Sequence, residues 1–408
     1  MNRTLLLQVV LLTLCVVWCG ARDGPTLDYD DENDTDVSED DINTSSIPSV
    51  ADIMKSFKAT RQKVNGTNET YIMVDDAVRA HLTGSTTLAV IPALYTLVFA
   101  VGLPANALGL WIMATKIRKL PSTVFLINLT TADLLLMLIL PFKISYHLQG
   151  NNWVFGEALC RTMTALFYGN MYCSILLLTV ISVDRYCALV HPFTSRQFRD
   201  NVFAAGVCSA IWVTTLLLVL PFLFVEQQLR PHNLNITTCH DVLLQDQQTG
   251  FFFRYFVSLV VVGFLIPCCV TLFCYGSVIK TLASNKKSYT RAAVVTLLIL
   301  LVYVCCFAPS NVILLIHHSE YQLTGDSDLY IYYMVCLVLS SAGSCIDPFI
   351  YYYISDEFRV RVKHVICCSK DQQSSRSGRT TTQELLRTNT TTNHHLLLKL
   401  PGQGNSEN

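Results

Sequence analysis

The chain has 408 residues, of which 51% are hydrophobic and only 14% are charged. Soluble proteins carry about 25% charged residues, so the composition excludes an ordinary soluble protein and favours a membrane protein. The formal net charge of −1 disfavours nucleic-acid binding, and the apolar part indicates one domain with flexible ends.

Residues 1–21 have the pattern of a secretory signal peptide. Arg3 gives the positive start, Leu5 to Trp18 the apolar centre, and Cys19 and Ala21 the small residues before a cleavage site. The alternative is a first membrane helix, for which the run is short.

Residues 22–87 are polar and predict a disordered extracellular tail. Asp28 to Asp41 holds nine carboxylates and no lysine or arginine, and such a run cannot bury a core. Glycosylation sequons fit this placement; they start at Asn33, Asn43, Asn65 and Asn68, with a further one at Asn235.

A candidate protease site lies in this tail at Lys55-Ser56. A trypsin-like protease binds a basic residue in its S1 pocket, and an extended tail can enter its cleft. The alternative is a solvated basic patch formed by Lys55, Lys58, Arg61 and Lys63. The spacing alone favours the patch.

Seven apolar runs follow, and each is long enough to cross a bilayer as a helix; they are 88–114, 122–148, 157–190, 203–226, 251–282, 288–317 and 328–354. They predict an all-α membrane protein, a seven-transmembrane helix bundle, over 88–354. Basic residues gather after spans one, three, five and seven, which makes these faces cytoplasmic and the N-terminus extracellular; Arg230 is the main exception.

The 16 cysteines indicate one disulfide. Cys15 and Cys19 leave with the signal peptide, and only Cys160 and Cys239 are placed to meet the oxidising outside. If the topology holds, these two pair with each other. The cysteine spacings do not fit a metal site.

Asp133 and Asp347 are carboxylates within spans, and Asn106 is a third polar group at depth. Such residues indicate function: the group could hold a sodium ion or a proton and release it on a conformational change. The alternative is a hydrogen-bonded cluster without a switching role. An intramembrane aspartyl protease would need a Gly-x-Gly-Asp context, which both sites lack, and common hydrolase motifs are missing. The chain is therefore predicted not to be an enzyme.

Two further features suggest a bundle that changes shape. Asp184-Arg185-Tyr186 ends span three, where an arginine held by its neighbouring acid can be released to a partner; the alternative is an arginine that only reaches the lipid headgroups. Prolines within or near the ends of five spans can act as hinges or be inert bends; they are Pro141, Pro221, Pro267, Pro309 and Pro348.

These marks resemble rhodopsin-like, G-protein-coupled receptors over residues 88–368; they are Asn106, Asp133, Cys160, Asp184-Arg185-Tyr186, Trp212, Pro267, Pro309 and Asp347 to Tyr351. The segments NNWVFGEALC (151–160), FYGNMYCSILL (167–177), NITTCHDVL (235–243) and FAPSNVILLIHH (307–318) are similar to the protease-activated, thrombin-receptor family. Details such as VHPFT (190–194) are most similar to its third subtype.

The resemblance implies cleavage by an extracellular serine protease between Lys55 and Ser56. The new end, Ser56-Phe57-Lys58-Ala59-Thr60-Arg61, would then act as a tethered ligand. About 32 residues separate Ser56 from span one, and at ~3.3 Å each they reach the outer pocket easily. Asp241 is expected to bind the new ammonium, with His240, His317 and His318 near Phe57.

The resemblance also implies a switch towards a heterotrimeric G protein, formed by Asp184, Arg185, Tyr186, Tyr275, Asp347, Pro348 and Tyr351. A sodium site would involve Asn106, Asp133, Ser174 and Asp347. Gly343 stands where relatives usually carry asparagine, and Met54 stands where thrombin favours proline. Both thrombin-like and trypsin-like proteases therefore stay open.

After span seven, residues 355–366 predict an amphipathic helix on the membrane, followed by palmitoylation at Cys367 and Cys368. The alternative is two free thiols. The cytoplasmic tail, 369–408, suits phosphorylation and arrestin binding at Ser374, Ser375, Ser377 and Thr380 to Thr382.

The sequence thus predicts a plasma-membrane receptor that is cleaved outside and signals inside. One alternative is a receptor for a diffusible peptide or nucleotide. The other is a co-receptor that docks a protease for another receptor of the family and signals little itself.

Overall fold

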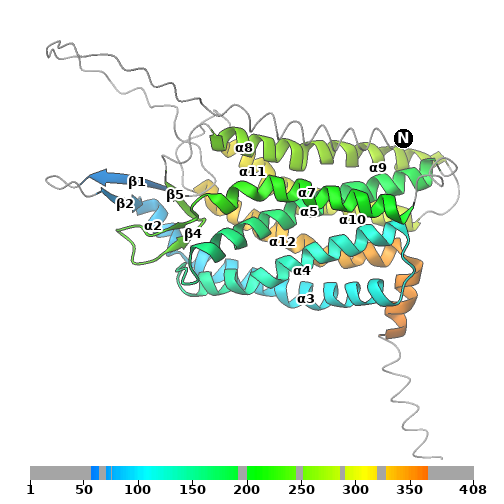
Figure 1. Ribbon diagram of the computed structural model, residues 1–408, viewed down its shortest axis with the longest axis horizontal. Helices are drawn as coiled ribbons and strands as arrows, with labels where there is room; N and C mark the ends of the chain where they lie inside the picture. The colour runs from blue at the N-terminus through cyan, green and yellow to red at the C-terminus, as the bar shows by residue number, and fades with distance from the viewer. Residues whose placement is uncertain are drawn as a thin grey trace, which may run out of the picture. The chain divides into compact units, whose positions relative to one another are not determined.

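The computed structural model describes residues 57–63, 70–74, 76–191, 200–244, 251–284, 290–318 and 328–365. Within these residues, seven helices are long and apolar enough to cross a membrane. This confirms the predicted seven-helix bundle, whose helices run side by side in Figure 1.

Four of the seven spans are each one uninterrupted α-helix, namely α4 (Pro121–Leu148), α5 (Glu157–Val190), α7 (Asn201–Phe224) and α12 (Asp328–Ile354). The first span is α3 (Ile91–Thr115), preceded by the π-helical turn η1 (Thr86–Val90). The remaining two are α8 (Phe251–Val260), η3 (Val261–Leu265) and α9 (Ile266–Ser284), then α10 (Thr290–Leu301), η4 (Val302–Phe307) and α11 (Ala308–His318).

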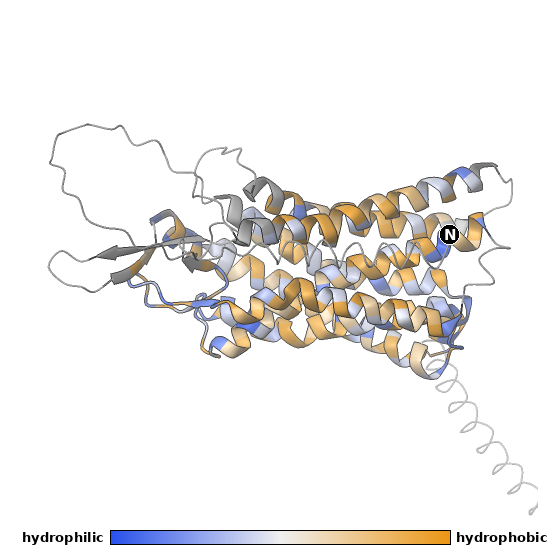
Figure 2. Ribbon diagram, turned by 45° about the horizontal axis from the view of Figure 1, so that its top comes forward, coloured by the Kyte–Doolittle hydropathy of each residue, from blue (hydrophilic) through white to orange (hydrophobic). Residues whose placement is uncertain are grey.

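The helices begin where local chemistry predicts. Proline is tolerated in the first turn of a helix, and Pro121 opens α4. Asp200 caps α7 by accepting a hydrogen bond from the Phe203 amide at 2.5 Å. Between these ends, large apolar side chains such as Leu138 and Phe273 remain 65% exposed. Figure 2 shows apolar residues along the outside of the helices, as lipid-facing surfaces require.

The predicted proline hinges take a specific form in two spans. The π-helical turns η3 and η4 end two residues before Pro267 and Pro309. Proline lacks the N–H that would bond the carbonyl four residues earlier, so the preceding turn is free to widen. The two widened turns lie in neighbouring spans.

A three-stranded sheet lies at one end of the bundle (Figure 1), with strand order β2-β1-β5. β1 (Phe57–Lys63) pairs antiparallel with β2 (Thr70–Val74) and parallel with β5 (Val242–Leu244). The short helix α2 (Asp76–Leu82) then leads into η1. The prediction of disorder for 22–87 is wrong for these described segments. Composition missed them because the strands pair with a loop far away in the sequence.

Residues after Ser355 form a separate unit, in which 356–365 are helical. This agrees with the predicted helix at 355–366. An ion pair between Arg359 and Asp356, one turn apart, lies on this helix. Cys367, Cys368 and the 369–408 tail lie outside the described residues.

Candidate functional site

The outer loop between α7 and α8 (residues 225–250, described to 244) is fastened to the top of α5. Cys160 and Cys239 form the predicted disulfide, with Cα atoms 5.8 Å apart. Within the loop, β3 (Gln228–Leu229) pairs with β4 (Thr238–Cys239). The Glu157 carboxylate accepts hydrogen bonds from the amides of Gln227 and Gln228, both at 2.8 Å. The loop is therefore held rigidly over the bundle.

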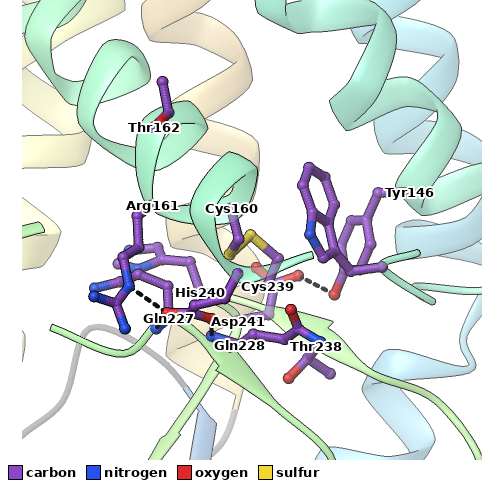
Figure 3. The surroundings of a disulfide bond; sticks show 12 residues. Tyr146, Cys160, Arg161, Thr162, Gln227, Gln228, Thr238, Cys239, His240 and Asp241 are labelled. Carbon is purple, nitrogen blue, oxygen red and sulfur yellow. Dashed lines mark hydrogen bonds and ion pairs between the residues drawn. A yellow bond between two sulfur atoms is a disulfide. The ribbon is translucent and has the colours of Figure 1, made fainter. Parts of the chain in front are cut away.

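Asp241 faces the bundle just after the disulfide. Its carboxylate accepts a hydrogen bond from the Tyr146 hydroxyl at 2.7 Å, and Figure 3 shows the two side chains pointing at each other. Asp241 is only 4% exposed. A ligand ammonium would therefore reach it only by entering the bundle mouth beside Tyr146.

His240 is the second loop residue that points inward, and its backbone has a positive φ of 68°. Its ring bonds Gln227 at 2.6 Å and the Tyr168 hydroxyl at 3.3 Å. Tyr168 in turn lies 3.1 Å from the Tyr333 hydroxyl. The loop is thus linked through His240 to α5 and α12.

A small cavity lies beneath the loop, and its lining includes Tyr146 of α4, Trp153 of the α4–α5 connection, Tyr168 of α5 and His240 of the loop. The Lys143 ammonium enters it, 4.7 Å from the ring centre of Phe167 and 5.7 Å from that of Tyr95. Aromatic faces attract cations at these distances. Cavity and loop together form an outer pocket with one carboxylate, one ammonium and several hydroxyl groups.

A polar cluster lies deeper, inside the bundle. Asp133 accepts hydrogen bonds from Ser344 at 2.7 Å and from Tyr351 at 3.2 Å, and Asn170 donates to it at 3.5 Å. The Asp347 carboxyl lies within hydrogen-bonding reach of that of Asp133. Both aspartates are buried, so the predicted pair of membrane carboxylates is brought together.

Asn106 joins this cluster through the backbone. Its amide donates to the Ser344 carbonyl at 2.8 Å, which Pro348 leaves free because proline has no N–H to bond it. Three buried oxygens nearby have no hydrogen-bond partner among the described residues: Asn106 Oδ1, Ser174 Oγ and Asp347 Oδ1. Ser174 is therefore not bonded to the cluster. Oxygens left unpaired beside two carboxylates are the chemistry that a sodium ion requires.

At the inner end of α5, Arg185 is held by its neighbouring acid and by α4. Arg185 donates to the Asp184 carboxylate at 2.8 Å and to the Ser122 hydroxyl at 2.5 Å. Ser122 also donates to Asp184 at 2.8 Å, so α4 shares in the contact. Tyr275 is buried in α9, and the Tyr351 hydroxyl donates to Asp133 in the polar cluster.

Several predicted sites are not described. Lys55, Ser56, the four tail sequons and the two palmitoylation cysteines lie outside the described residues. His317 and His318 end α11, but their side chains are not described. Asn235 is exposed, as glycosylation requires.

Sequence reasoning missed Tyr146, Lys143, Asn170 and Ser344. Nothing in their local sequence separates them from other polar residues of membrane helices. Asn233, whose side chain hydrogen-bonds the backbone of Val74, was missed too. Its position six residues before Cys239 was the only available signal.

Comparisons with known proteins agree with this architecture. Residues 105–351 match the family model of the 7 transmembrane receptor (rhodopsin family). The chain is 46% identical to human Proteinase-activated receptor 3 over 286 residues, covering 70% of the chain and 76% of that relative. It is 41% identical to human Proteinase-activated receptor 4 over 335 residues, or 82% and 85% of the two chains. It is also 40% identical to human Proteinase-activated receptor 2 over 322 residues, or 75% and 81%.

Proposed function

The chain belongs to the rhodopsin family of seven-transmembrane receptors and, within it, to the proteinase-activated receptors, and on this premise we propose a tethered-ligand mechanism for it. A multi-pass receptor of the plasma membrane, it is cut by an extracellular serine protease after Lys55. The new N-terminus, Ser56-Phe57, then activates it.

One observation supports this proposal most. β1 starts at Phe57, the second residue after the cut, and pairs with β5 from Val242 onward. Because the pairing is parallel, the residue before Phe57, Ser56, would lie opposite the residue before Val242, Asp241. The new ammonium at Ser56 would therefore form close to Asp241, the only loop carboxylate that is buried among the described residues of the bundle mouth. The hydroxyl of Tyr146 would yield Asp241 to this stronger, charge-assisted partner.

The test is signalling in cells that express this chain, treated with trypsin or thrombin. We expect the Lys55→Ala variant to lose the protease response and to keep its response to the synthetic peptide Ser-Phe-Lys-Ala-Thr-Arg. Lys63→Ala, which changes a basic residue of the same tail outside the Ser56–Arg61 ligand, is the matched control and should respond like wild type. A full protease response of Lys55→Ala would refute this cleavage site.

Inside the cell, the receptor is proposed to activate a heterotrimeric G protein by releasing Arg185 from Asp184 and Ser122. Arrestin would bind the phosphorylated tail, and lipid would hold the palmitoylated cysteines. If the chain alone stays silent to protease and peptide but enhances a second receptor of the family, the co-receptor function is correct instead.

We further propose that Asp133, Asp347, Asn106 and Ser174 hold a sodium ion in the resting bundle. A bound cation neutralises two carboxylates that could not both stay charged so close together. Replacing sodium by choline should raise the potency of the peptide about threefold, the change expected for an ion at twice its dissociation constant. Asp133→Asn should abolish this sensitivity, and Asp356→Asn, outside the bundle, should retain it. Equal sensitivity in both variants would exclude the site.

A further inference from the structure

The outer edge of β2 is taken by the outer loop. The Val74 amide donates to Asn233 Oδ1 at 3.2 Å, and Asn233 Nδ2 donates back to the Val74 carbonyl at 2.6 Å. The His232 amide donates to the Ile72 carbonyl at 2.7 Å. One side chain and one loop amide thus pair with β2 as a neighbouring strand would.

The inner edge of β2 is taken by β1. The backbone N–H and C=O groups of successive residues in a strand point alternately to its two edges. The backbone groups of Ile72 and Val74 point to the loop, so those of Met73 point to β1. The far edge of β1 pairs with β5. Residues 232–233 and β5 belong to the same outer loop, which Cys239 ties to α5. The two tail strands therefore lie between two arms of one fastened loop.

We propose that Asn233 is a positioning residue that anchors the tail and sets the place of the tethered ligand. This inference rests on the proposed function. With β2 anchored at Ile72 and Val74, the chain between the new end and its first attachment runs from Ser56 to Ile72, 16 residues by number, rather than the 32 to span one. A shorter, oriented tether raises the effective concentration of the ligand at the pocket.

Asparagine suits this role because its amide offers a donor and an acceptor side by side, which match the N–H and C=O of Val74. Alanine offers neither. Aspartate keeps the acceptor and places a second acceptor against the Val74 carbonyl. Asn233 does not belong to a sequon, since the Asn235 sequon begins two residues later. Its substitution therefore leaves glycosylation unchanged.

The anchor is tested by comparing two agonists on the same receptor. In Asn233→Ala, the trypsin concentration for half-maximal signalling should rise about three- to tenfold, the range expected from losing one or two net hydrogen bonds. The potency of the free Ser-Phe-Lys-Ala-Thr-Arg peptide, which uses no tether, should stay unchanged. Glu226→Ala, an exposed residue of the same loop, is the matched control. Surface expression and release of an N-terminal epitope are measured in parallel.

A second pair of variants keeps the test decisive if the loop is disturbed. Six Gly/Ser residues inserted directly after Val74 lengthen only the chain behind the anchor. They should hardly change trypsin potency in wild type and should lower it further in Asn233→Ala. Equal effects of the insertion on trypsin potency in wild type and in Asn233→Ala would overturn the anchor. Three results for Asn233→Ala alone would overturn it as well: an unchanged trypsin potency, a loss of peptide potency equal to the loss of trypsin potency, or a loss of trypsin potency matched by slower epitope release. No response of wild type to either agonist would refute the proposed function instead.

Discussion

The hydroxyl group of Tyr303 joins three spans at the level of η4. It donates to the Ile175 carbonyl of α5 at 2.8 Å and lies within hydrogen-bonding distance of the Thr179 and Thr271 hydroxyls. Thr271 belongs to α9, so one buried oxygen connects α5, α9 and the sixth span. The inner half of that span cannot swing outward without breaking these bonds.

Tyr303→Phe should therefore raise signalling in the absence of agonist. A buried hydrogen-bond group contributes about 1 kcal/mol to the arrangement that contains it, which corresponds to a roughly fivefold change in the ratio of resting to active receptor. Basal second-messenger formation, normalised to surface expression, measures it. Tyr332→Phe, whose side chain is 63% exposed, is the control. An unchanged basal level would show that these hydroxyls are only structural.

The π-helical turn η3 brings its backbone unusually close to α5. A Cβ atom on Gly263 would lie 2.5 Å from Cδ1 of Tyr172, closer than real Cβ atoms approach their neighbours. Tyr172 is fully buried, and its hydroxyl donates to Asn311 of α11 at 3.4 Å. Glycine at this position therefore lets the widened turn, α5 and α11 meet.

Gly263→Ala should lower the thermal stability of the purified receptor. The added methyl must displace Tyr172 or the turn, and overpacking of this kind costs about 1–3 kcal/mol. Gly276→Ala, in α9 of the same span, meets no atom within 4 Å, so alanine there should be neutral or slightly stabilising. Melting of the two variants in the same detergent gives the comparison. Equal melting temperatures of the two variants would show that η3 accommodates the added methyl group without loss of stability.

The spans could be predicted because each carries its own signal. A run such as 122–148 must be a helix in lipid whatever its neighbours are, and α4 indeed covers Pro121–Leu148. The Cys160–Cys239 disulfide followed from topology and elimination. Partners of a buried polar group could not be predicted in the same way. Ser344 and Asn170 meet Asp133 only through helix rotation and packing, which hydropathy does not encode.

The tail shows the same limit on a larger scale. Its composition predicts disorder, yet β1 and β2 gain their partners from a loop more than 150 residues later in the chain. The same loop carries Asp241 and the disulfide. The described tail strands and the outer loop are therefore one folded assembly.

Strand pairing should decide which basic residue of the tail is cut first. A protease needs an extended segment free to enter its cleft, and Arg61 lies within β1, where it is paired with Ile72 of β2. Brief trypsin treatment of cells should therefore cleave after Lys55, ahead of β1, before it cleaves after Arg61. Mass spectrometry of the released peptides gives the order.

Releasing β1 should remove this selectivity. In Met73→Pro, the residue that faces Thr60 loses its amide proton, and proline in a paired strand breaks the ladder. Cleavage after Arg61 should then accelerate severalfold, which destroys the ligand and shortens the response to trypsin. Asp76→Pro, at the first residue of α2, where proline is tolerated, should keep the wild-type order. If Arg61 is cut as fast as Lys55 in wild type, the pairing does not protect the ligand, and the sheet would have to form only after cleavage.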